Sequence, residues 1–218
     1  MSKPQGRVKI EWSPEFAYAI GLLATDGNLS PDGRHFNFTS KDEELIGLFK
    51  ASLCLANAIG RKARGGETEK RYYVVQFSDV LFYDFCLDIG LHPNKSKTLA
   101  EIKIPRKHFL DFLRGSFDGD GSFYSYWDPR WKSSFMFYAS FVSASKRHID
   151  WLRKAIFEHC GVRGHITKAA KSSVYQLKYA KKESLVLLRA MYRNTKLRSL
   201  SRKKLKIQAV LDIIGESL

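Results

Sequence analysis

Two aspartates, Asp26 and Asp120, end two copies of one short pattern that lie 94 residues apart. The first copy reads AIGLLATDG over residues 19–27, and the second reads LRGSFDGDG over residues 113–121. In each copy a glycine, Gly21 or Gly115, stands five residues before the acid, and another glycine follows it. Two carboxylates that meet at one place can share a divalent metal ion and direct hydrolytic chemistry there. The pattern therefore indicates a carboxylate-based metal site.

Helices must position these acids. Before the second acid, apolar side chains recur at helical spacing, at Phe109, Phe112, Leu113 and Phe117. A glycine inside a helix costs about 1 kcal/mol relative to alanine, so Gly115 indicates that another backbone comes close. If the two helices pack through Gly21 and Gly115, their C-terminal ends come together, and Asp26 then meets Asp120.

This pair of motifs resembles that of the LAGLIDADG homing endonuclease family. The second copy is a close match, whereas the first departs at Ala19, Ile20, Ala24 and Thr25 and keeps its glycines and last acid. The resemblance covers roughly residues 14–215 and implies that Asp26 and Asp120 are metal ligands. Asp118 aligns with Ala24 of the other copy, so we do not expect its side chain to be a metal ligand.

Composition limits the partners. The 218 residues include 37 Lys and Arg against 22 Asp and Glu, which gives a net charge of +15. Such a balance indicates a polyanionic partner or an anionic surface. The sequence has no run of 18 apolar residues and no visible secretory signal, so we expect no membrane partner. Three cysteines without metal-site spacing indicate free thiols in a reducing intracellular compartment, either the cytoplasm or an organelle matrix.

Apolar periodicity predicts an α+β fold with two pseudo-symmetric halves, each with the order helix, two strands, helix, two strands, helix (αββαββα). The first half, residues 1–93, has expected helices at 13–26, 42–58 and 79–89, strands at 34–40, 60–66 and 71–77, and a turn-rich connection at 28–33. A linker follows at 94–105. The second half, residues 106–218, has expected helices at 106–120, 146–160, 181–192 and 202–215 and strands at 121–127, 135–143, 162–169 and 173–179. The resemblance implies paired motif helices between the halves and two antiparallel sheets that form a DNA-binding saddle.

Strand alternation predicts which side chains occupy the free faces of these sheets. Such a set combines Lys and Arg, which bind phosphate, with Gln, Asn, Tyr and Ser, which can contact base edges. In the first half the set is His35, Asn37, Lys62, Arg64, Arg71, Tyr73 and Gln76. In the second half it is Tyr124, Tyr138, Ser140, Arg163, His165, Lys168, Gln176 and Lys178.

The expected chemistry is phosphodiester hydrolysis with Mg²⁺ or another divalent cation as cofactor, because carboxylate, carbonyl and phosphate oxygens suit this ion. Backbone carbonyls at the helix ends can complete the ligand shell, at Ala24, Thr25, Asp118 and Gly119. The resemblance implies a lysine near each cleavage centre, for which Lys97, Lys103 and Lys203 are the candidates. Where the family often has glutamine after the second strand, this chain has Ser40 and Ser145.

Two functions remain open from the sequence. The first is a site-specific double-strand DNA endonuclease with a long asymmetric target. The second is an intron RNA maturase or a non-cleaving DNA-binding relative, so intron RNA is a second candidate partner. The presence of both acids favours cleavage. Because one chain carries both motifs, we expect a monomer.

Overall fold

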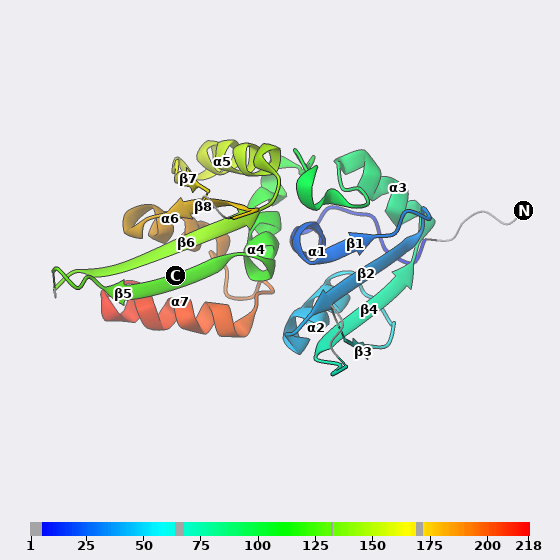
Figure 1. The fold of residues 1–218 in the computed structure, drawn as a ribbon, viewed down its shortest axis with the longest axis horizontal. Coiled ribbons are helices and arrows are strands. Elements are labelled where there is room, and N and C mark those ends of the chain that lie inside the picture. The colour runs from blue at the N-terminus through cyan, green and yellow to red at the C-terminus, as the bar shows by residue number, and fades with distance from the viewer. Residues whose placement is uncertain (1–5, 64–67, 132, 169–171) are drawn as a thin grey trace, which may run out of the picture. The chain divides into compact units, whose positions relative to one another are not determined.

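The computed structural model describes residues 6–63, 68–131, 133–168 and 172–218. These form two compact units (Figure 1). The first unit contains residues Met1–Lys95 and Ile102–Gly119, and the second contains Ser96–Glu101 and Asp120–Leu218. The helix of the second motif therefore lies in the same unit as the helix of the first. The predicted halves follow the internal repeat, whereas the compact units follow the packing of these two helices.

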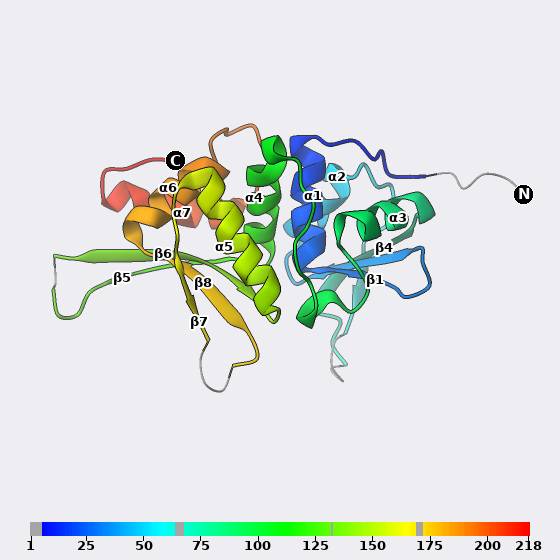
Figure 2. The ribbon, with the colours of Figure 1, turned by 90° about the horizontal axis from the view of Figure 1, so that it is seen from above.

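The first unit is an antiparallel sheet with helices on one side. Its elements are α1 (Pro14–Thr25), β1 (Gly27–Leu29), β2 (His35–Ser40), α2 (Glu43–Ser52), β3 (Gly60–Lys62), β4 (Tyr72–Ser78), α3 (Val80–Ile89) and α4 (Phe109–Gly119), which follows a 3₁₀ turn at Arg106–His108. The strand order is β1-β2-β4-β3. Figure 2 shows the labelled helices of this unit on one side of its strands.

Side-chain caps explain where these helices begin. The Ser13 hydroxyl accepts a hydrogen bond from the Phe16 amide at 3.1 Å, and Pro14 occupies the first turn of α1, where no amide donor is needed. Asp79 caps α3 by accepting from the Phe82 amide at 2.9 Å. The same carboxylate accepts from the amides of Arg7 and Val8, so it also anchors the segment before α1.

Aromatic packing holds the helices of the first unit against its sheet. Phe38 on β2 stacks on Phe49 of α2 with ring centroids 4.2 Å apart. Phe36 stacks on Phe77 across the neighbouring strands at 4.8 Å. All four rings are buried, whereas Asn37 of β2 and Gln76 of β4, which face the other side of the sheet, are polar. One face of the sheet therefore forms the core, and the other is open to a ligand.

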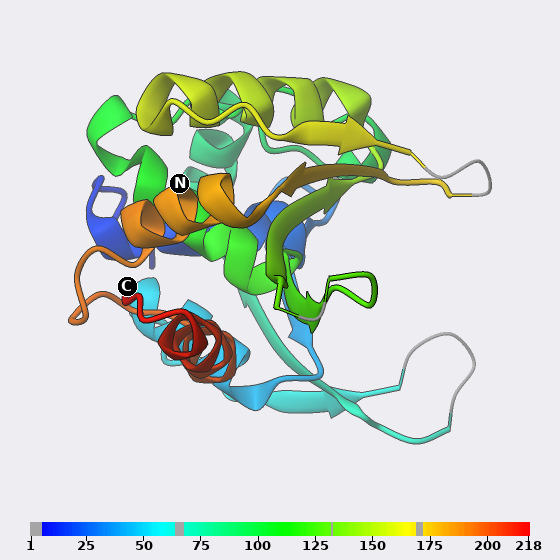
Figure 3. The ribbon, with the colours of Figure 1, turned by 90° about the vertical axis from the view of Figure 1, so that its left-hand side faces the viewer.

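The second unit repeats this arrangement. It contains β5 (Ser122–Trp127), β6 (Phe135–Ser143), α5 (Lys146–Cys160), β7 (His165–Thr167), β8 (Tyr175–Tyr179), α6 (Lys181–Met191) and α7 (Ser201–Ile213), and the strand order is β5-β6-β8-β7. Helices α5 and α6 contact each other and the same sheet, as their yellow-green and orange ribbons show in Figure 3. Gly161 ends α5 in the left-handed conformation that favours glycine.

The predicted α+β class and the order of elements are confirmed, with local differences. Residues 27–29 form strand β1, where a turn-rich connection was expected, because three residues are too few for a visible period. Helix α2 ends at Ser52 and not near residue 58, since Cys54 has a φ of 54° and leaves the helical region. Strands β3 and β7 are shorter than predicted. In the described part of the chain, no helix has the length and apolar character needed to cross a membrane.

Candidate functional site

Helices α1 and α4 contact each other through backbone at Gly21 and Gly115. A Cβ atom added to Gly21 would lie 2.1 Å from the carbonyl oxygen of Phe112 and 3.0 Å from the Cα of Gly115. A Cβ atom added to Gly115 would lie 2.1 Å from the carbonyl oxygen of Tyr18. Real Cβ atoms do not approach other atoms so closely, so only glycine allows this crossing. The structure thus places both motif glycines at the helix contact.

The same contact places the carboxylate of the first motif against the end of α4. Asp26 is the C-cap of α1, and its amide donates to the Leu22 carbonyl at 2.9 Å. The Thr25 hydroxyl donates to Asp26 Oδ2 at 3.1 Å. A Cβ atom on Gly119 would lie 2.6 Å from this oxygen. Asp26 therefore occupies space that a side chain at residue 119 would fill, directly beside the residue that precedes Asp120 in the chain.

Asp118 lies in a different setting from the last acids of the two motifs, Asp26 and Asp120. Its side chain is fully buried, and its Oδ2 accepts a hydrogen bond from the Tyr18 hydroxyl at 2.8 Å. The Arg114 guanidinium lies 5.3 Å from the Tyr18 ring and forms a buried ion pair with Asp111 at 2.9 Å. This cluster joins α4 to α1. The Asp118 carboxylate thus forms an interhelical contact.

Each motif end is accompanied by one buried lysine. Lys95 Nζ donates to the carbonyl of Gly27, the residue after Asp26, within the first unit. Within the second unit, Lys203 Nζ donates to the carbonyl of Gly121, the residue after Asp120, at 2.5 Å. Lys203 was a candidate from the sequence, whereas Lys95 was missed, because no sequence feature separates it from its exposed neighbour Lys97.

The other predicted lysines and serines lie elsewhere. Lys97 and Lys103 are exposed, so neither has the buried setting of Lys95. Ser145 caps α5 and donates to the Leu99 carbonyl at 2.5 Å. Ser40 accepts from the Asp42 amide at 3.1 Å. The Ser40 hydroxyl therefore serves a local turn, whereas the Ser145 hydroxyl joins the start of α5 to the segment before α4.

The donor chemistry at the motif ends fits a hard divalent cation. Among the described residues, no group of three or more His, Cys, Asp and Glu side chains could hold a metal alone. In the first unit, the candidate donors are instead the Asp26 carboxylate and the backbone carbonyls in the last turns of α1 and α4, at Ala24, Thr25, Asp118 and Gly119. In the second unit, the candidate donor is the Asp120 carboxylate. All of these are oxygen atoms, which Mg²⁺ prefers, and it commonly keeps positions for water and substrate phosphate.

On the first sheet, the free face holds four of the predicted side chains. Strand register and alternation place His35, Asn37, Lys62 and Gln76 on this face. The His35 ring contacts Asp32 at 2.5 Å, and this hydrogen bond lowers the pKa of the Asp32 carboxyl to about 2. Arg71, which is exposed, pairs with Glu69 ahead of β4.

One prediction for this sheet does not match the free face. Tyr73 alternates with Gln76 in β4 and shares the side of Val75 and Phe77. Its hydroxyl accepts from Arg61 at 2.6 Å, and a hydrogen bond with Glu43 of α2 raises its pKa. The position of Tyr73 is therefore corrected to the helix side of the sheet, because Gln76 and Tyr73 are an odd number of residues apart. Arg64 lies outside the described residues.

On the second sheet, the free face holds a tyrosine and lysine cluster. Tyr124 pairs with Tyr138 across β5 and β6, and their rings stack at 5.2 Å. Lys178 Nζ lies 3.9 Å from the Tyr138 ring centroid, and a hydrogen bond with Tyr126 raises the pKa of Tyr138. The register places the remaining predicted residues His165, Gln176 and Ser140 on the same face, although Ser140 is fully buried beneath its neighbours. Lys168 follows β7 and contacts Tyr175.

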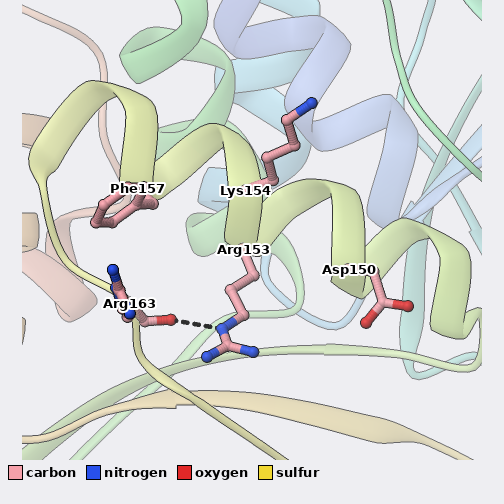
Figure 4. Close-up of a pocket in the computed structure, with 5 residues that line it drawn as sticks. All are labelled: Asp150, Arg153, Lys154, Phe157 and Arg163. Atoms are coloured by element: carbon pink, nitrogen blue, oxygen red, sulfur yellow. Dashed lines mark hydrogen bonds between the residues drawn. The ribbon is translucent and has the colours of Figure 1, made fainter.

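Arg163 lies on the opposite side of the second unit from this face. It lines an open recess of about 380 Å³ on α5 together with Asp150, Arg153, Lys154 and Phe157 (Figure 4). Its guanidinium carbon lies 5.0 Å from the Phe157 ring centroid, and its carbonyl accepts from Arg153 Nε at 2.9 Å. The predicted place of Arg163 on the free face is therefore wrong, because β7 begins only at His165.

Comparisons of sequence found no match, whereas comparisons of structure found proteins with a similar fold. No protein-family model and no curated protein matches the chain. The I-SmaMI meganuclease bound to uncleaveable DNA is similar with a TM-score of 0.63 and 12% identity, over 96% of this chain and 92% of that one. The LAGLIDADG homing endonuclease I-LtrWI bound to target DNA is similar with a TM-score of 0.60 and 12% identity, over 93% and 91%.

A third similar structure is full-length DUF199/WhiA from Thermatoga maritima, with a TM-score of 0.57 and 17% identity. The match covers 96% of this chain but only 64% of that protein. A separate structure of the N-terminal LAGLIDADG domain of DUF199/WhiA is matched over 88% of both chains. Paired motif helices, two four-stranded antiparallel sheets and these likenesses agree, and the chain therefore has the LAGLIDADG fold.

Proposed function

We propose that this chain is a site-specific double-strand DNA endonuclease that hydrolyses phosphodiester bonds with Mg²⁺ or another divalent cation. The observation that carries the proposal is the position of Asp26 Oδ2 against Gly119, beside the second motif acid in the chain. A structural role alone does not require an acid at both helix ends, since the negative end of the helix dipole disfavours a carboxylate there. A bound cation would offset this cost.

The surrounding residues support a nucleic-acid substrate. The chain has a net charge of +15, and the free face of each sheet carries lysine, histidine, tyrosine and amide side chains that can bind phosphates and base edges. Two of the similar structures are nucleases bound to DNA, with which this chain shares the fold. Because the two free faces differ in composition, the target should be a long asymmetric duplex.

The chain's own residues have defined tasks in this proposal. Asp26 and Asp120 supply the negative charge that holds a cation at the helix ends. When bound, the cation would neutralise the phosphate and make water a better nucleophile. The ammonium groups of Lys95 and Lys203 add positive charge directly after each motif, where they can stabilise charge that develops on the phosphate.

The alternative is a nucleic-acid-binding protein that does not cut, including an RNA maturase. Two observations favour it. The first motif departs from the family pattern at four positions, and the similar DUF199/WhiA structures are identified by a LAGLIDADG domain and not as endonucleases. Both motif acids are present in this chain, and this favours the enzyme.

One experiment separates these functions. The purified chain is incubated with a randomised duplex library and Mg²⁺, and the cut ends are sequenced. The proposal predicts cleavage of both strands at one sequence and no cleavage in EDTA. Binding without cleavage would support the alternative. In either case the affinity should fall steeply with salt, with a log–log slope of about −0.9 for each phosphate contact, whereas a slope near zero would contradict DNA as the partner.

We also propose that the protein is a monomer. Both motif helices lie in one compact unit of one chain, so the paired-helix contact needs no second copy. Sedimentation of the DNA-free protein should give the mass of one chain, 25.0 kDa. A stable dimer would contradict the expectation.

A further inference from the structure

Three amide side chains form one row across the free face of the first sheet. Asn28 on β1 pairs with Asn37 on β2, and Asn37 pairs with Gln76 on β4. Residues that pair directly across antiparallel strands have their side chains on the same face, about 5 Å apart. The adjoining residues in these strands, Phe36, Phe38 and Phe77, are buried against the helices. The three amides therefore point to the uncovered side of the sheet.

The amide side chains of the row are accessible to a ligand, and one of them is held in a fixed orientation. Asn28 and Gln76 are exposed, and Asn37 is half-buried. Within the described part of the chain, the side-chain amides of Asn28 and Gln76 have no hydrogen-bond partner. The Thr39 hydroxyl donates to Asn37 Oδ1 at 3.0 Å, which leaves the Asn37 amino group as the outward donor. Asn57 donates to the backbone carbonyl of Gln76 at 2.9 Å and holds that part of β4 in place.

The chemistry of the row favours purines, and adenine at two of its three positions. An amide side chain presents a donor and an acceptor side by side, which match N7 and the N6 amino group of adenine in the major groove. Guanine is instead contacted mainly by Arg or Lys, and neither occurs in the row. Asn37, with its amino group outward, fits a base acceptor such as purine N7. Two spacings between strands amount to about 10 Å, and this is close to three base-pair steps of about 3.4 Å.

The place of the row in the chain links it to the cleavage region. Asn28 is only two residues after Asp26, a distance of at most about 7 Å along an extended chain. The corresponding row of the second sheet is Ser122, Ser140 and Lys178. There the two hydroxyls bond each other at 2.7 Å, and the Gln176 amino group donates to Ser140 at 3.1 Å. The two rows therefore offer different chemistry to a duplex.

We propose that Asn28 and Gln76 determine specificity by selecting adenine, and that Asn37 selects a purine, in the part of the N-terminal half-site next to the cleavage region. The inference rests on the proposed function, because it assumes that this face binds duplex DNA. To that function it adds a preference for particular bases and a difference between the two half-sites. A·T pairs should be preferred on one side of the cleavage centre, and the other side should lack this preference.

The test is selection of bound sequences from a randomised duplex library, with Ca²⁺ in place of Mg²⁺ so that the readout does not depend on cleavage. The wild-type chain should enrich A·T pairs at two positions on one side, with a purine preference between them. Gln76→Ala should lower the preference at one of these positions by about 5- to 150-fold, the value of one bidentate contact, and leave the other half unchanged. The matched control is Gln208→Ala, since Gln208 lies on α7 and bonds Asp212.

A chemical substitution tests the contact itself. Replacing the affected adenine by 7-deazaadenine removes N7, so it should weaken binding by the wild-type chain and not by Gln76→Ala. The inference is overturned if the chain selects a defined site and Gln76→Ala changes no position, or if deaza substitution affects both proteins equally. Absence of any sequence selection would count against the proposed function as well. Loss of cleavage with the Gln76 preference retained would count against the enzyme alone.

Discussion

The Cα of Gly115 lies 3.0 Å from the point that a Cβ atom would occupy on Gly21, so the two motif helices touch backbone to backbone. Side chains normally keep helix axes 8–10 Å apart. The glycines remove that spacer, and this brings the ends of both helices together. Residues that lie 94 positions apart in the sequence thereby become neighbours.

The first prediction concerns these glycines. Gly115→Ala should lower the free energy of unfolding by about 2 kcal/mol or more, because the new methyl group meets the Tyr18 carbonyl and the helices must separate. Gly47→Ala on α2 is the control. A Cβ there meets nothing within 4 Å, so alanine should stabilise the helix by about 0.5–1 kcal/mol. Urea unfolding measures both, and equal effects would contradict the close contact.

The second prediction concerns the pair Tyr18 and Asp118. Tyr18→Phe removes a buried hydrogen bond of 2.8 Å to a fully buried carboxylate, and the expected loss of stability is about 1–3 kcal/mol. Asp118→Asn should cost less when Tyr18 is already Phe, because the two residues interact. A double-mutant cycle by urea unfolding gives this coupling energy. Additive effects would show that the pair contributes nothing beyond its separate contacts.

The sequence was sufficient for the fold but only for part of the site. Glycine and acid spacing in residues 19–27 and 113–121 predicted the helix pairing, because a glycine in an apolar helix has a specific steric meaning. Alternation located β6 correctly over Phe135–Ser143. It failed for Tyr73, which is three residues from Gln76 and so lies on the other face, and for Arg163, which precedes β7. Lys95 was not identified, because its position depends on a 3₁₀ turn at Lys95–Lys97 and on the local left-handed conformation of Asn94.

The third prediction concerns the two buried lysines. Lys95→Met and Lys203→Met should each lower the cleavage rate by about 10²- to 10³-fold, because charge that stabilises the transition state is lost. DNA affinity should change little, since each buried ammonium group can make at most one contact with a DNA phosphate. Lys206→Met, on the exposed side of the same helix as Lys203, is the control. Equal cleavage rates for all three variants would show that Lys95 and Lys203 do not contribute to cleavage.

The fourth prediction concerns thiol reactivity. Burial raises the pKa of Cys86 well above its usual value and also raises the pKa of Cys160, whereas Cys54 is exposed. Because the thiolate is the reactive form, a disulfide reagent should modify Cys54 first and Cys86 only after unfolding. The Cys160 rate should rise as pH increases toward its raised pKa. Equal reaction of all three thiols in the native protein would contradict the described burial.

We expect Asp26 and Asp120 together to hold the metal ion with which the protein cuts DNA. The most direct test measures Mg²⁺-dependent cutting of the selected duplex by Asp26→Asn and Asp120→Asn, with nicked and linear products separated on a gel. Asparagine keeps the shape of each side chain and removes the charge. If one shared metal serves both strands, each variant should bind the duplex nearly as the wild type does and leave both strands intact. Full cutting of both strands by Asp120→Asn with Mg²⁺ present would contradict the account.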